Sequence, residues 1–428
     1  MDYSFEKSLW FATAGNAPQS TPFENGSKVD FAVVGAGVTG SVAALALSSG
    51  GASVMVLEAS TPASGATGRS GGYIVPVFSA VRPGDLITAR GEIGSRLVHF
   101  TARSAASTFE LIRRHAIDCD ASQSGWFNPA PSPSQIDRLA SDVSIWRDAG
   151  VDLEMLDALD TKLRTGATDY AGASFAPSGG TIHPVKLVYG LLERALERGA
   201  RLHTRLPVVS VAKSGKEWLL STTRGTVRAK CVLLCTNGNS GPLSNLIDRS
   251  VVHLLICQMA TQPIDSRIRA HLFGQGSALS DMRHNLFTYR FDRDWRLVTG
   301  TMPLLPQHSG ASASKRMARR LDRILGLSGV PNVDYAWFGK ASVTEDRLPA
   351  IFNVADGLYA ITACNGRGLA LSASTALLLA RALLNGTLSH LPVPVRAPKP
   401  LAYRRMQSVG GRFYGAIGSV RDLLQQYR

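Results

Sequence analysis

Three glycines early in the chain have the spacing of a phosphate-binding turn. Gly35, Gly37 and Gly40 form a G-x-G-x-x-G motif directly after the apolar stretch 29–34. The first glycine permits a sharp turn, the second lets the backbone approach a pyrophosphate, and the third lets the next helix pack closely on the strand. A helix that begins here also presents free N–H groups and a partial positive charge. The motif therefore predicts a phosphate-bearing ligand.

A glutamate follows the motif at the distance expected for ribose binding. Glu58 lies 18 residues after Gly40, at the end of a second apolar stretch, 53–57. A carboxylate at this point can accept hydrogen bonds from the two ribose hydroxyls of an adenosine. The alternative is a glycine-rich turn in another kind of α/β protein. Because both strands, the helix and the acid are present, we expect a dinucleotide-binding unit.

Two further glycine-rich segments could bring backbone amides to the same ligand. Residues 63–73 (ASGATGRSGGY), the glycine-rich loop, have small residues at a density that lets N–H groups crowd around a ligand. A flexible surface loop is the alternative, but an apolar, strand-like stretch at 74–78 anchors its far end. Residues 365–368 separate a predicted strand, 358–362, from a predicted helix, 368–384. This second strand–glycine–helix unit offers another positively polarised helix N-terminus.

Composition and charge describe a globular chain with an excess of arginine. The 428 residues are 45% hydrophobic, which suffices for a packed core and for two or three domains. The net charge of +14 either favours an anionic cofactor and substrate or marks a face for nucleic acid or a membrane surface. Because no run is densely basic, we expect no nucleic-acid partner.

The cysteines and apolar stretches bear on the cellular compartment. Five cysteines without a C-x-x-C pair argue against a disulfide framework or a metal site and favour a reducing compartment. The N-terminus lacks a basic start followed by an apolar run, and polar residues interrupt the apolar stretch 368–384. We expect a cytoplasmic protein without a transmembrane segment, either a monomer or a homo-oligomer.

The rest of the chain separates a helical region from strand-rich ones. Helices are predicted at 89–114 and 134–148, around a turn-rich patch at 125–133. Short strands follow over 201–234, and alternation over 251–300 predicts antiparallel strands. Before all of these, residues 1–27 form either a loose arm or an arm pinned by Trp10 and Phe11, and we favour the pinned arm.

Several motifs together resemble those of a known family. GATGRSGG is similar to that family's G-A-S-G-R-N-G-G loop, GGTIHPVKLVYGL to its G-G-x-x-H-P segment, and FTYRFDRDWRLVTG to its Y-x-R…D-x-R-L hairpin. KSLWFATA resembles its N-terminal arm, and ACNGRGLALS its last glycine segment. The chain resembles, nearly end to end, the FAD-dependent D-amino-acid-oxidase/glycine-oxidase superfamily, and within it the γ-glutamylputrescine-oxidase-like branch.

The resemblance implies a two-domain α/β (α+β) fold. A Rossmann-type FAD-binding domain would alternate with a discontinuous substrate domain of antiparallel sheet and helices. The expected segments are an N-terminal arm (1–28), FAD-binding parts (29–84, 181–245 and 336–390), substrate-domain parts (85–180, mostly helical, and 246–335, antiparallel sheet) and a C-terminal tail (391–428).

The resemblance also implies a non-covalent FAD whose ADP half lies on the first glycine unit. Glu58 would hold the ribose, and Val208 would lie beside the adenine. A reduced flavin carries negative charge at its N1/C2=O edge, which the helix N-terminus after Gly366 would stabilise. The expected FAD contacts are Gly35, Ala36, Gly37, Val38, Thr39, Gly40, Glu58, Ala59, Ser60, Gly65, Ala66, Thr67, Arg69, Ser70, Gly71, Gly72, Val208, Thr236, Asn237, Gly238, Asn365, Gly366, Arg367, Gly368 and Leu369.

The implied reaction is oxidation of a small amine or amino acid. A hydride would pass from the C–H bond beside nitrogen to flavin N5, and water would hydrolyse the imine. This chemistry needs no strong acid–base pair, and the sequence shows no Ser-His-Asp order or H-E-x-x-H motif. The candidate catalytic or substrate-binding residues are Tyr73, His183, Tyr289, Arg290 and Arg296.

Each candidate also has a structural interpretation. Tyr73 could simply pack beside the flavin, and His183, before a proline, could cap a helix or lie in the core. The two arginines could pair with acids across their own hairpin, or one of them could clamp a substrate carboxylate.

Departures from the family pattern leave the electron acceptor open. Ser70 replaces the usual asparagine, and Ala363–Cys364 replace a glycine and an aromatic residue. The segment 341–349 lacks the cysteine that sarcosine-oxidase relatives link to flavin, and their oxygen-assisting lysine falls near Val298. The acceptor is therefore O2 or a carrier. Rival functions are a dehydrogenase that reduces a quinone or carrier, a non-redox flavin-binding or assembly protein and, least favoured, an NAD-dependent enzyme.

Overall fold

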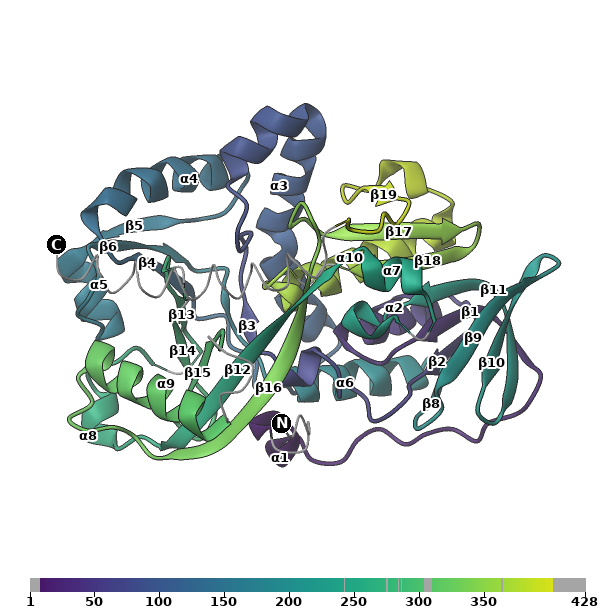
Figure 1. Cartoon of the computed structure of the whole chain (residues 1–428), viewed down its shortest axis with the longest axis horizontal. Helices are drawn as coiled ribbons and strands as arrows, with labels where there is room; N and C mark the ends of the chain where they lie inside the picture. The colour runs from purple at the N-terminus through teal and green to yellow at the C-terminus, as the bar shows by residue number, and fades with distance from the viewer. Residues whose placement is uncertain are drawn as a thin grey trace.

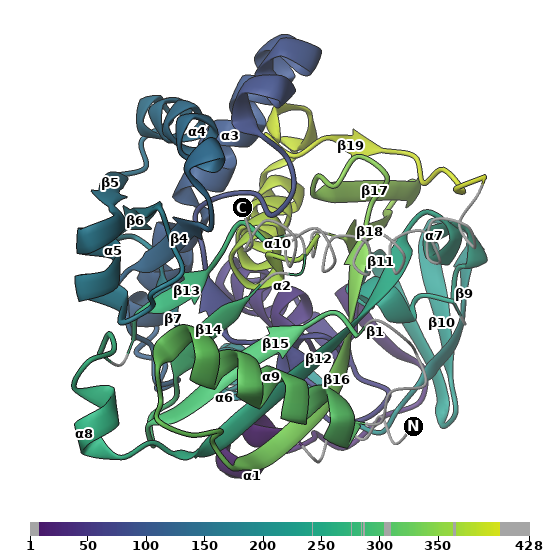
Figure 2. The ribbon, with the colours of Figure 1, turned by 60° about the vertical axis from the view of Figure 1, so that its left-hand side comes forward.

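Two large β-sheets and the helices that cover them make up the described chain (Figures 1 and 2). The structure is a computed structural model, and it describes residues 8–241, 243–274, 276–283, 285, 287–303, 310–362 and 365–402. The expected substitutions at Ala363–Cys364, and most of the predicted C-terminal tail, lie outside these residues. A two-stranded sheet pairs β3 (Tyr73–Ile74) with β7 (Gly180–Thr181).

The first sheet has nine strands and is organised around β1 (Ser27–Val34). This strand runs parallel to β2 (Val54–Leu57) on one side and to β11 (Gly225–Leu234) on the other. β2 pairs in parallel with β8 (Arg201–His203), and β11 with β18 (Leu358–Thr362). The carboxyl ends of these five strands therefore meet at one edge of the sheet, where ligands bind in open α/β sheets.

The remaining strands of this sheet are antiparallel or peripheral. β17 (Ala350–Ala355) pairs with β18, and β19 (Val395–Arg396) pairs with β17. The hairpin of β9 (Val208–Ser214) and β10 (Glu217–Thr222) extends from β11.

Helices rich in small residues pack beside this sheet. α2 (Val38–Ser49) contacts both α6 (Pro184–Leu196) and α10 (Gly368–Asn385), and α10 also contacts the long α3 (Pro83–Arg114), which is kinked at Gly91. Among the described residues, α10 is the one helix long and apolar enough to cross a bilayer, and 61% of it is buried inside the protein. Its packing between α2 and α3 is that of a core helix.

The second sheet has eight strands in the order β16-β12-β15-β14-β13-β4-β6-β5. Its strands are β4 (Trp126–Ala130), β5 (Glu154–Asp157), β6 (Gly172–Ala176), β12 (Val252–Pro263), β13 (Ala278–Ser280), β14 (Thr288–Phe291), β15 (Arg296–Thr301) and β16 (Val333–Val343). α9 (Gly310–Leu325) packs on β12, β15 and β16, and α4 (Ile136–Asp148) packs on α3. The short helices α5 (Ala158–Thr165) and α8 (Ser266–Arg269) lie beside this sheet, whereas α7 (Asn245–Arg249) packs Ile247 into the core of the first sheet.

Secondary structure predicted from local sequence patterns was wrong where the partners of a strand are distant in sequence. The patch predicted as turns at 125–133 contains β4, which pairs with β6 and β13. The stretch 74–78, predicted as strand-like, has strand structure only at its start, in β3. The second sheet continues to Val343 in β16, so the expected boundary at 335–336 falls inside this strand.

The N-terminal arm is pinned, as its aromatic residues predict. Its short helix α1 (Leu9–Thr13) begins after Ser8, whose side chain accepts a hydrogen bond from the backbone N–H of Phe11. Leu9 and Trp10 are buried, and α1 contacts α6. The arm is therefore part of the core between the two large sheets.

Candidate cofactor and substrate site

A cavity of 1520 Å³ opens at the carboxyl ends of the parallel strands. Its walls come from the first sheet at Gly35 and Glu58, and from the second sheet at Gln258 and Phe338. Pockets for drug-sized ligands measure roughly 300–1,000 Å³. The space therefore suits a dinucleotide together with a second, smaller molecule.

The first glycine turn has the geometry that its motif predicts. Gly35 has φ +101°, and a Cβ there would lie 2.9 Å from the carbonyl oxygen of Cys235. A Cβ on Gly40 would lie 1.9 Å from the carbonyl oxygen of Gly35, so only glycine lets α2 pack this closely. Gly37 provides no side-chain cap for α2, although Thr67 Oγ1 accepts a hydrogen bond from the N–H of Val38 (3.1 Å). The N-terminus of α2 thus faces the cavity.

Glu58 lies directly beside this turn. Its carboxylate accepts hydrogen bonds from the N–H groups of Ala36 and Ser60, both at 2.8 Å. Burial raises the pKa of Glu58, and the backbone N–H donors partly oppose that shift. The carboxylate is therefore held in place at the cavity wall, where an adenosine ribose could donate to it.

The glycine-rich loop is fixed by its own hydrogen bonds. The N–H of Gly68 donates to the carbonyl of Ala63 (2.9 Å), and Nε of Arg69 donates to the carbonyl of Ser64 (3.0 Å). Arg69 also reaches the carbonyl of Phe338 on β16 at 3.3 Å. The loop lines the cavity along most of its length, so it is a built wall and not a free surface loop.

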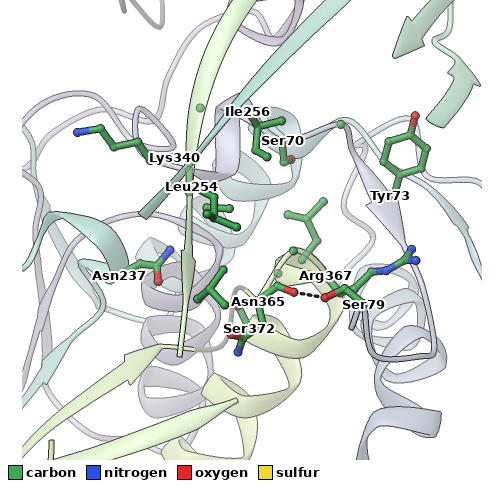
Figure 3. A pocket seen from close by; sticks show the side chains of 18 of the residues that line it. Ser70, Tyr73, Ser79, Asn237, Leu254, Ile256, Lys340, Asn365, Arg367 and Ser372 are labelled. Carbon is green, nitrogen blue, oxygen red and sulfur yellow. Dashed lines mark hydrogen bonds between the residues drawn. The ribbon is translucent and has the colours of Figure 1, made fainter. Parts of the chain in front are cut away.

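The C-terminal glycine turn closes the opposite wall (Figure 3). Asn365 has φ +36°, and its Oδ1 accepts hydrogen bonds from the N–H and the hydroxyl of Thr344, at 2.9 and 3.0 Å. The hydroxyl of Ser79 donates to the carbonyl of Asn365. Arg367 occupies the N-cap position of α10 without a side-chain cap hydrogen bond, so this helix N-terminus also faces the cavity.

Buried polar atoms in the cavity wall lack hydrogen-bond partners within the described chain. Among them are Oδ1 of Asn128, Oε1 of Gln258 and Nδ2 of Asn365. Buried polar atoms in folded proteins are nearly always hydrogen-bonded. Together with the two open helix N-termini, they fit a phosphate-bearing ligand with several polar groups, as FAD has.

Most residues expected to contact FAD line this one cavity. They are Gly35, Gly37, Val38, Thr39, Glu58, Ala59, Gly65, Ala66, Thr67, Arg69, Ser70, Gly71, Gly72, Val208, Thr236, Asn237, Gly238, Asn365, Gly366, Arg367, Gly368 and Leu369. Ala36, Gly40 and Ser60 lie behind the wall. Ala36 and Ser60 orient Glu58, and Gly40 allows the close packing of α2.

Of the five candidate catalytic residues, only Tyr73 lines the cavity. Its hydroxyl donates to the carbonyl of Val298 at 3.3 Å. Burial raises the pKa of Tyr73 to about 12, so the phenol is neutral at ordinary pH. Tyr289 instead lies in the core, where it stacks on Phe273 with ring centroids 4.4 Å apart and donates to the carbonyl of Thr165.

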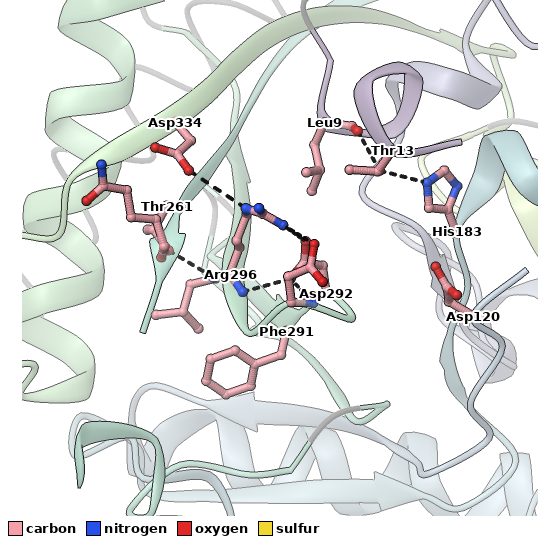
Figure 4. A network of polar contacts seen from close by, with 12 residues as sticks. Leu9, Thr13, Asp120, His183, Thr261, Phe291, Asp292, Arg296 and Asp334 are labelled. Atoms are coloured by element: carbon pink, nitrogen blue, oxygen red, sulfur yellow. Dashed lines mark hydrogen bonds and ion pairs between the residues drawn. The ribbon is translucent and has the colours of Figure 1, made fainter. Parts of the chain in front are cut away.

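His183 caps a helix and does not reach the cavity (Figure 4). Its Nδ1 accepts a hydrogen bond from the N–H of Lys186 (3.2 Å), and Nε2 lies 3.0 Å from the hydroxyl of Thr13 on the arm. Burial lowers the pKa of His183 to about 3, so the ring is neutral. The structural interpretation of this histidine matches its position.

Neither hairpin arginine contacts the cavity. Arg296 pairs with Asp292 (3.1 Å) and Asp294 (2.5 Å) of its own hairpin and with Asp334 (3.7 Å) on β16, and these acids hold it in place (Figure 4). Arg290 is 2% exposed and donates to backbone carbonyls, including that of Gly72. A substrate carboxylate therefore meets neither guanidinium in this arrangement.

Two other arginines line the cavity close to β13. Arg283 forms a 2.5 Å ion pair with Asp281, and both side chains are nearly inaccessible to solvent. No local pattern predicts this pair, because it follows a three-residue strand, β13, whose neighbours lie far along the chain. Arg367, expected to serve only the flavin, donates from Nη1 to the hydroxyl of Ser280 (3.0 Å), and its guanidinium lies over the ring of Trp126 (4.9 Å).

Comparison with known proteins agrees with this geometry. The family model described as FAD dependent oxidoreductase (DAO) matches residues 30–382. γ-Glutamylputrescine oxidoreductase of Escherichia coli (strain K12) is 28% identical over 402 residues, which cover 89% of this chain and 92% of the relative. The probable oxidoreductase OrdL of Haemophilus influenzae is 24% identical and covers 88% of both chains.

Solved structures share the fold. Glycine oxidase from Geobacillus kaustophilus has a TM-score of 0.70 at 21% identity, over 85% of this chain and 96% of that one. An L-amino acid deaminase from Proteus vulgaris has a TM-score of 0.72 at 18% identity, over 91% and 97% of the two chains. With the family model matching most of the sequence, the chain belongs to the DAO family of FAD-dependent oxidoreductases.

Proposed function

We propose that this enzyme oxidises the C–N bond of a small amine or amino acid, with hydride transfer to FAD and hydrolysis of the imine in water. One observation carries the proposal: a single cavity joins the open N-termini of α2 and α10 to a second wall that carries Tyr73 and Arg367. The relatives named for glutamylated putrescine and glycine support an amine or amino-acid substrate.

The chain's own residues would hold the cofactor and leave the redox chemistry to it. Bound FAD supplies the hydride acceptor. Glu58 would accept hydrogen bonds from the ribose, and the N-terminus of α2 would face the pyrophosphate. The N-terminus of α10 would favour negative charge on the flavin.

Arg367 is the residue best placed to orient an anionic substrate. No acid forms an ion pair with it among the described residues, and burial lowers the pKa of Arg367 only to about 10, so it is charged at neutral pH. A buried cation gains most from a charged, hydrogen-bonded partner. In Figure 3 its guanidinium extends toward Tyr73, on the same side of the cavity. A substrate carboxylate bound there would place the neighbouring amine close to the phenol.

We infer that FAD binds non-covalently, and the low reactivity of the nearby cysteine supports this. The segment 341–349 contains no cysteine, and Cys235 lines the cavity beside the first glycine turn. Burial raises the pKa of Cys235 to about 12, and a protonated thiol is a poor nucleophile. Acid precipitation should release all of the flavin into the supernatant, and colour left in the pellet would contradict this proposal.

A carrier as electron acceptor is the second candidate. Val298, near which the resemblance places the oxygen-assisting lysine of sarcosine-oxidase relatives, is fully buried. Among the described residues, Lys340 is the one lysine in the cavity wall, and it is exposed on β16. Peroxide formation during turnover would indicate O2, whereas reduction of a quinone analogue without peroxide would indicate a carrier.

The cytoplasm is the compartment that suits the cysteines. Cys119, Cys231, Cys235 and Cys257 are free and buried. Unpaired thiols persist in a reducing environment.

The decisive test is anaerobic reduction of the FAD-loaded protein by a panel of amines and amino acids. At least one should bleach the oxidised flavin absorption band, and Arg367→Gln should raise the concentration needed for half-maximal bleaching by an anionic substrate about tenfold or more. Lys399→Gln, which removes a cation far along the chain from any cavity residue, is the matched control. A fully loaded protein that no member of the panel reduces would contradict the proposal.

A further inference from the structure

The glycine-rich loop is held from behind by three donors that come from distant parts of the chain. Nε1 of Trp337 donates to the carbonyl of Arg69 at 3.1 Å, and Nε1 of Trp10 donates to the carbonyl of Ser70 at 2.7 Å. Nη1 of Arg290 donates to the carbonyl of Gly72 at 2.9 Å and to that of Gly71 at 3.5 Å. Trp10, Trp337 and Arg290 are called the carbonyl clamp below.

The clamp is one buried cluster. Its three side chains are 1 to 2% exposed. The rings of Trp10 and Trp337 meet edge to face with centroids 6.2 Å apart, and the guanidinium of Arg290 lies 5.2 Å from the ring centre of Trp10. Because its members come from α1, β14 and β16, the arm and the second sheet act on the same loop.

The opposite face of the loop carries two unused donors. A trans peptide directs its C=O and its N–H to opposite sides. The carbonyl of Ser70, which accepts from Trp10, shares its peptide with the N–H of Gly71. The carbonyl of Gly71, which accepts from Arg290 at 3.5 Å, shares its peptide with the N–H of Gly72. Both N–H groups therefore point away from the clamp. Gly71 and Gly72 are buried and line the cavity, and neither N–H has an acceptor within the described chain. Buried, unpaired backbone N–H groups are rare, which indicates that a ligand supplies the acceptors.

Arg290 adds a charge to this arrangement. Arg290 donates only to backbone carbonyls, those of Phe291, Ile182, Gly71 and Gly72. It forms no ion pair with an acid among the described residues. A charge acts strongly in a medium of low dielectric constant. One peptide therefore separates this cation from the cavity, where it favours negative charge.

We propose that the carbonyl clamp positions the amides of Gly71 and Gly72 for FAD, and that Arg290 favours the reduced, anionic flavin over the oxidised form. The inference rests on the proposed binding of FAD in this cavity. It makes Trp10, on the N-terminal arm, a positioning residue of the cofactor site, although Trp10 does not line the cavity.

The indole contribution is tested by the dissociation constant of FAD. Trp10→Phe keeps an aromatic ring but removes the donor, and it should raise this constant about five- to tenfold. Trp218→Phe is the matched control, because Nε1 of Trp218 also donates to a backbone carbonyl, that of Asp356 at 3.2 Å, on the far strand β10. If Trp10→Phe does not fold, Trp337→Phe removes the neighbouring donor, on the carbonyl of Arg69, and should also raise the dissociation constant of FAD. Equal affinities for the Trp10 variant and its control would overturn the clamp.

The charge contribution is tested by the reduction potential of the bound flavin. Arg290→Gln should lower the midpoint potential by about 30 mV, which is a tenfold loss of preference for the two-electron reduced form. Arg290→Lys keeps the charge and should retain most of the potential. A purely structural role would weaken binding of both redox forms and leave the potential unchanged, and that result would refute the charge effect.

These measurements separate the clamp from the proposed reaction, because dithionite can reduce the flavin without substrate. Wild-type protein that binds no FAD would overturn the cofactor site and the clamp together. Wild-type protein that binds FAD but is reduced by no amine would overturn only the proposed reaction, and the clamp would still stand or fall on the two variants.

Discussion

Glu58 is the side chain that we propose orients the adenosine half of FAD. Its carboxylate is held by the N–H groups of Ala36 and Ser60 at the mouth of the first turn. Glu58→Ala should lower FAD affinity by about 10- to 100-fold, because hydrogen bonds to a charged group contribute roughly 1.5–3 kcal/mol. Flavin content per protein, read from the absorption spectrum, measures the loss.

A matched control for Glu58→Ala is Glu217→Ala. Glu217 belongs to β10 and pairs with Arg228 at 3.6 Å, away from the cavity wall. Its removal should leave flavin content unchanged. Full occupancy in the Glu58 variant would show that the ribose is bound by other groups.

The buried ring of His183 should make the stability of the fold depend on pH, although this ring should take no part in catalysis. Burial lowers its pKa to about 3 in the folded protein, against about 6.5 when unfolded, so between these values the unfolded chain binds more protons. Stability therefore falls as pH falls below 6.5, by about 2 kcal/mol at pH 5.

His183→Asn should remove this part of the pH dependence, because asparagine caps helices without titrating. Urea unfolding of both proteins at pH 5 and pH 7 measures it. The difference between the two pH values should be about 2 kcal/mol smaller in the variant. Identical pH dependence in the two proteins would show that this ring is not buried neutral.

At the scale of elements, the clearest prediction concerns the glycine-rich loop. Gly72 has φ +76°, and a Cβ there would lie 2.4 Å from Nη1 of Arg290 and 2.5 Å from the carbonyl oxygen of Ile182. Gly72→Ala should therefore displace the loop and lower flavin content several-fold. Gly199→Ala is the control, because Gly199 has φ +83° but nothing within 4 Å of its Cβ.

Both variants share the cost of a positive φ, about 1 kcal/mol. The unfolding free energy should therefore fall further for Gly72→Ala than for Gly199→Ala, and only Gly72→Ala should lose flavin. Equal flavin content in the two variants would contradict the close contact between the loop and Arg290.

The sequence predicted elements best where the signal is local. The strand, glycine turn and helix from β1 to α2 are visible because neighbouring residues determine turn geometry and helix packing. β4 was missed because its partners, β6 and β13, are fixed only by tertiary pairing. For the same reason the Asp281–Arg283 pair, at the end of β13, could not be found from spacing.

For the catalytic candidates too, local contacts can be predicted from the sequence and tertiary contacts cannot. Arg296 stands two residues from Asp294 and four from Asp292, and this local pairing keeps it from the cavity. The sequence identifies Arg367 only as part of the glycine turn at 365–368, and not as a candidate for binding substrate. Its approach to Trp126 and Ser280 depends on how the two large sheets meet, which no local pattern records.

At the scale of the whole molecule, one site is built from segments that are far apart in sequence. The first turn at Gly35, the glycine-rich loop and the turn at Gly366 all line the same cavity. Parallel pairing of β1, β11 and β18 places the first and last of these at one sheet edge. The arm closes the arrangement from behind through Trp10.

Hydrogen–deuterium exchange with and without FAD tests this convergence most directly. Peptides covering 64–73 and 365–372 should both exchange at least tenfold more slowly when FAD is bound, because both supply amides to the same ligand. A peptide covering α5, remote from the cavity wall, should be unchanged. Protection of the first segment with unchanged exchange in the second would contradict the claim that both glycine turns hold one flavin.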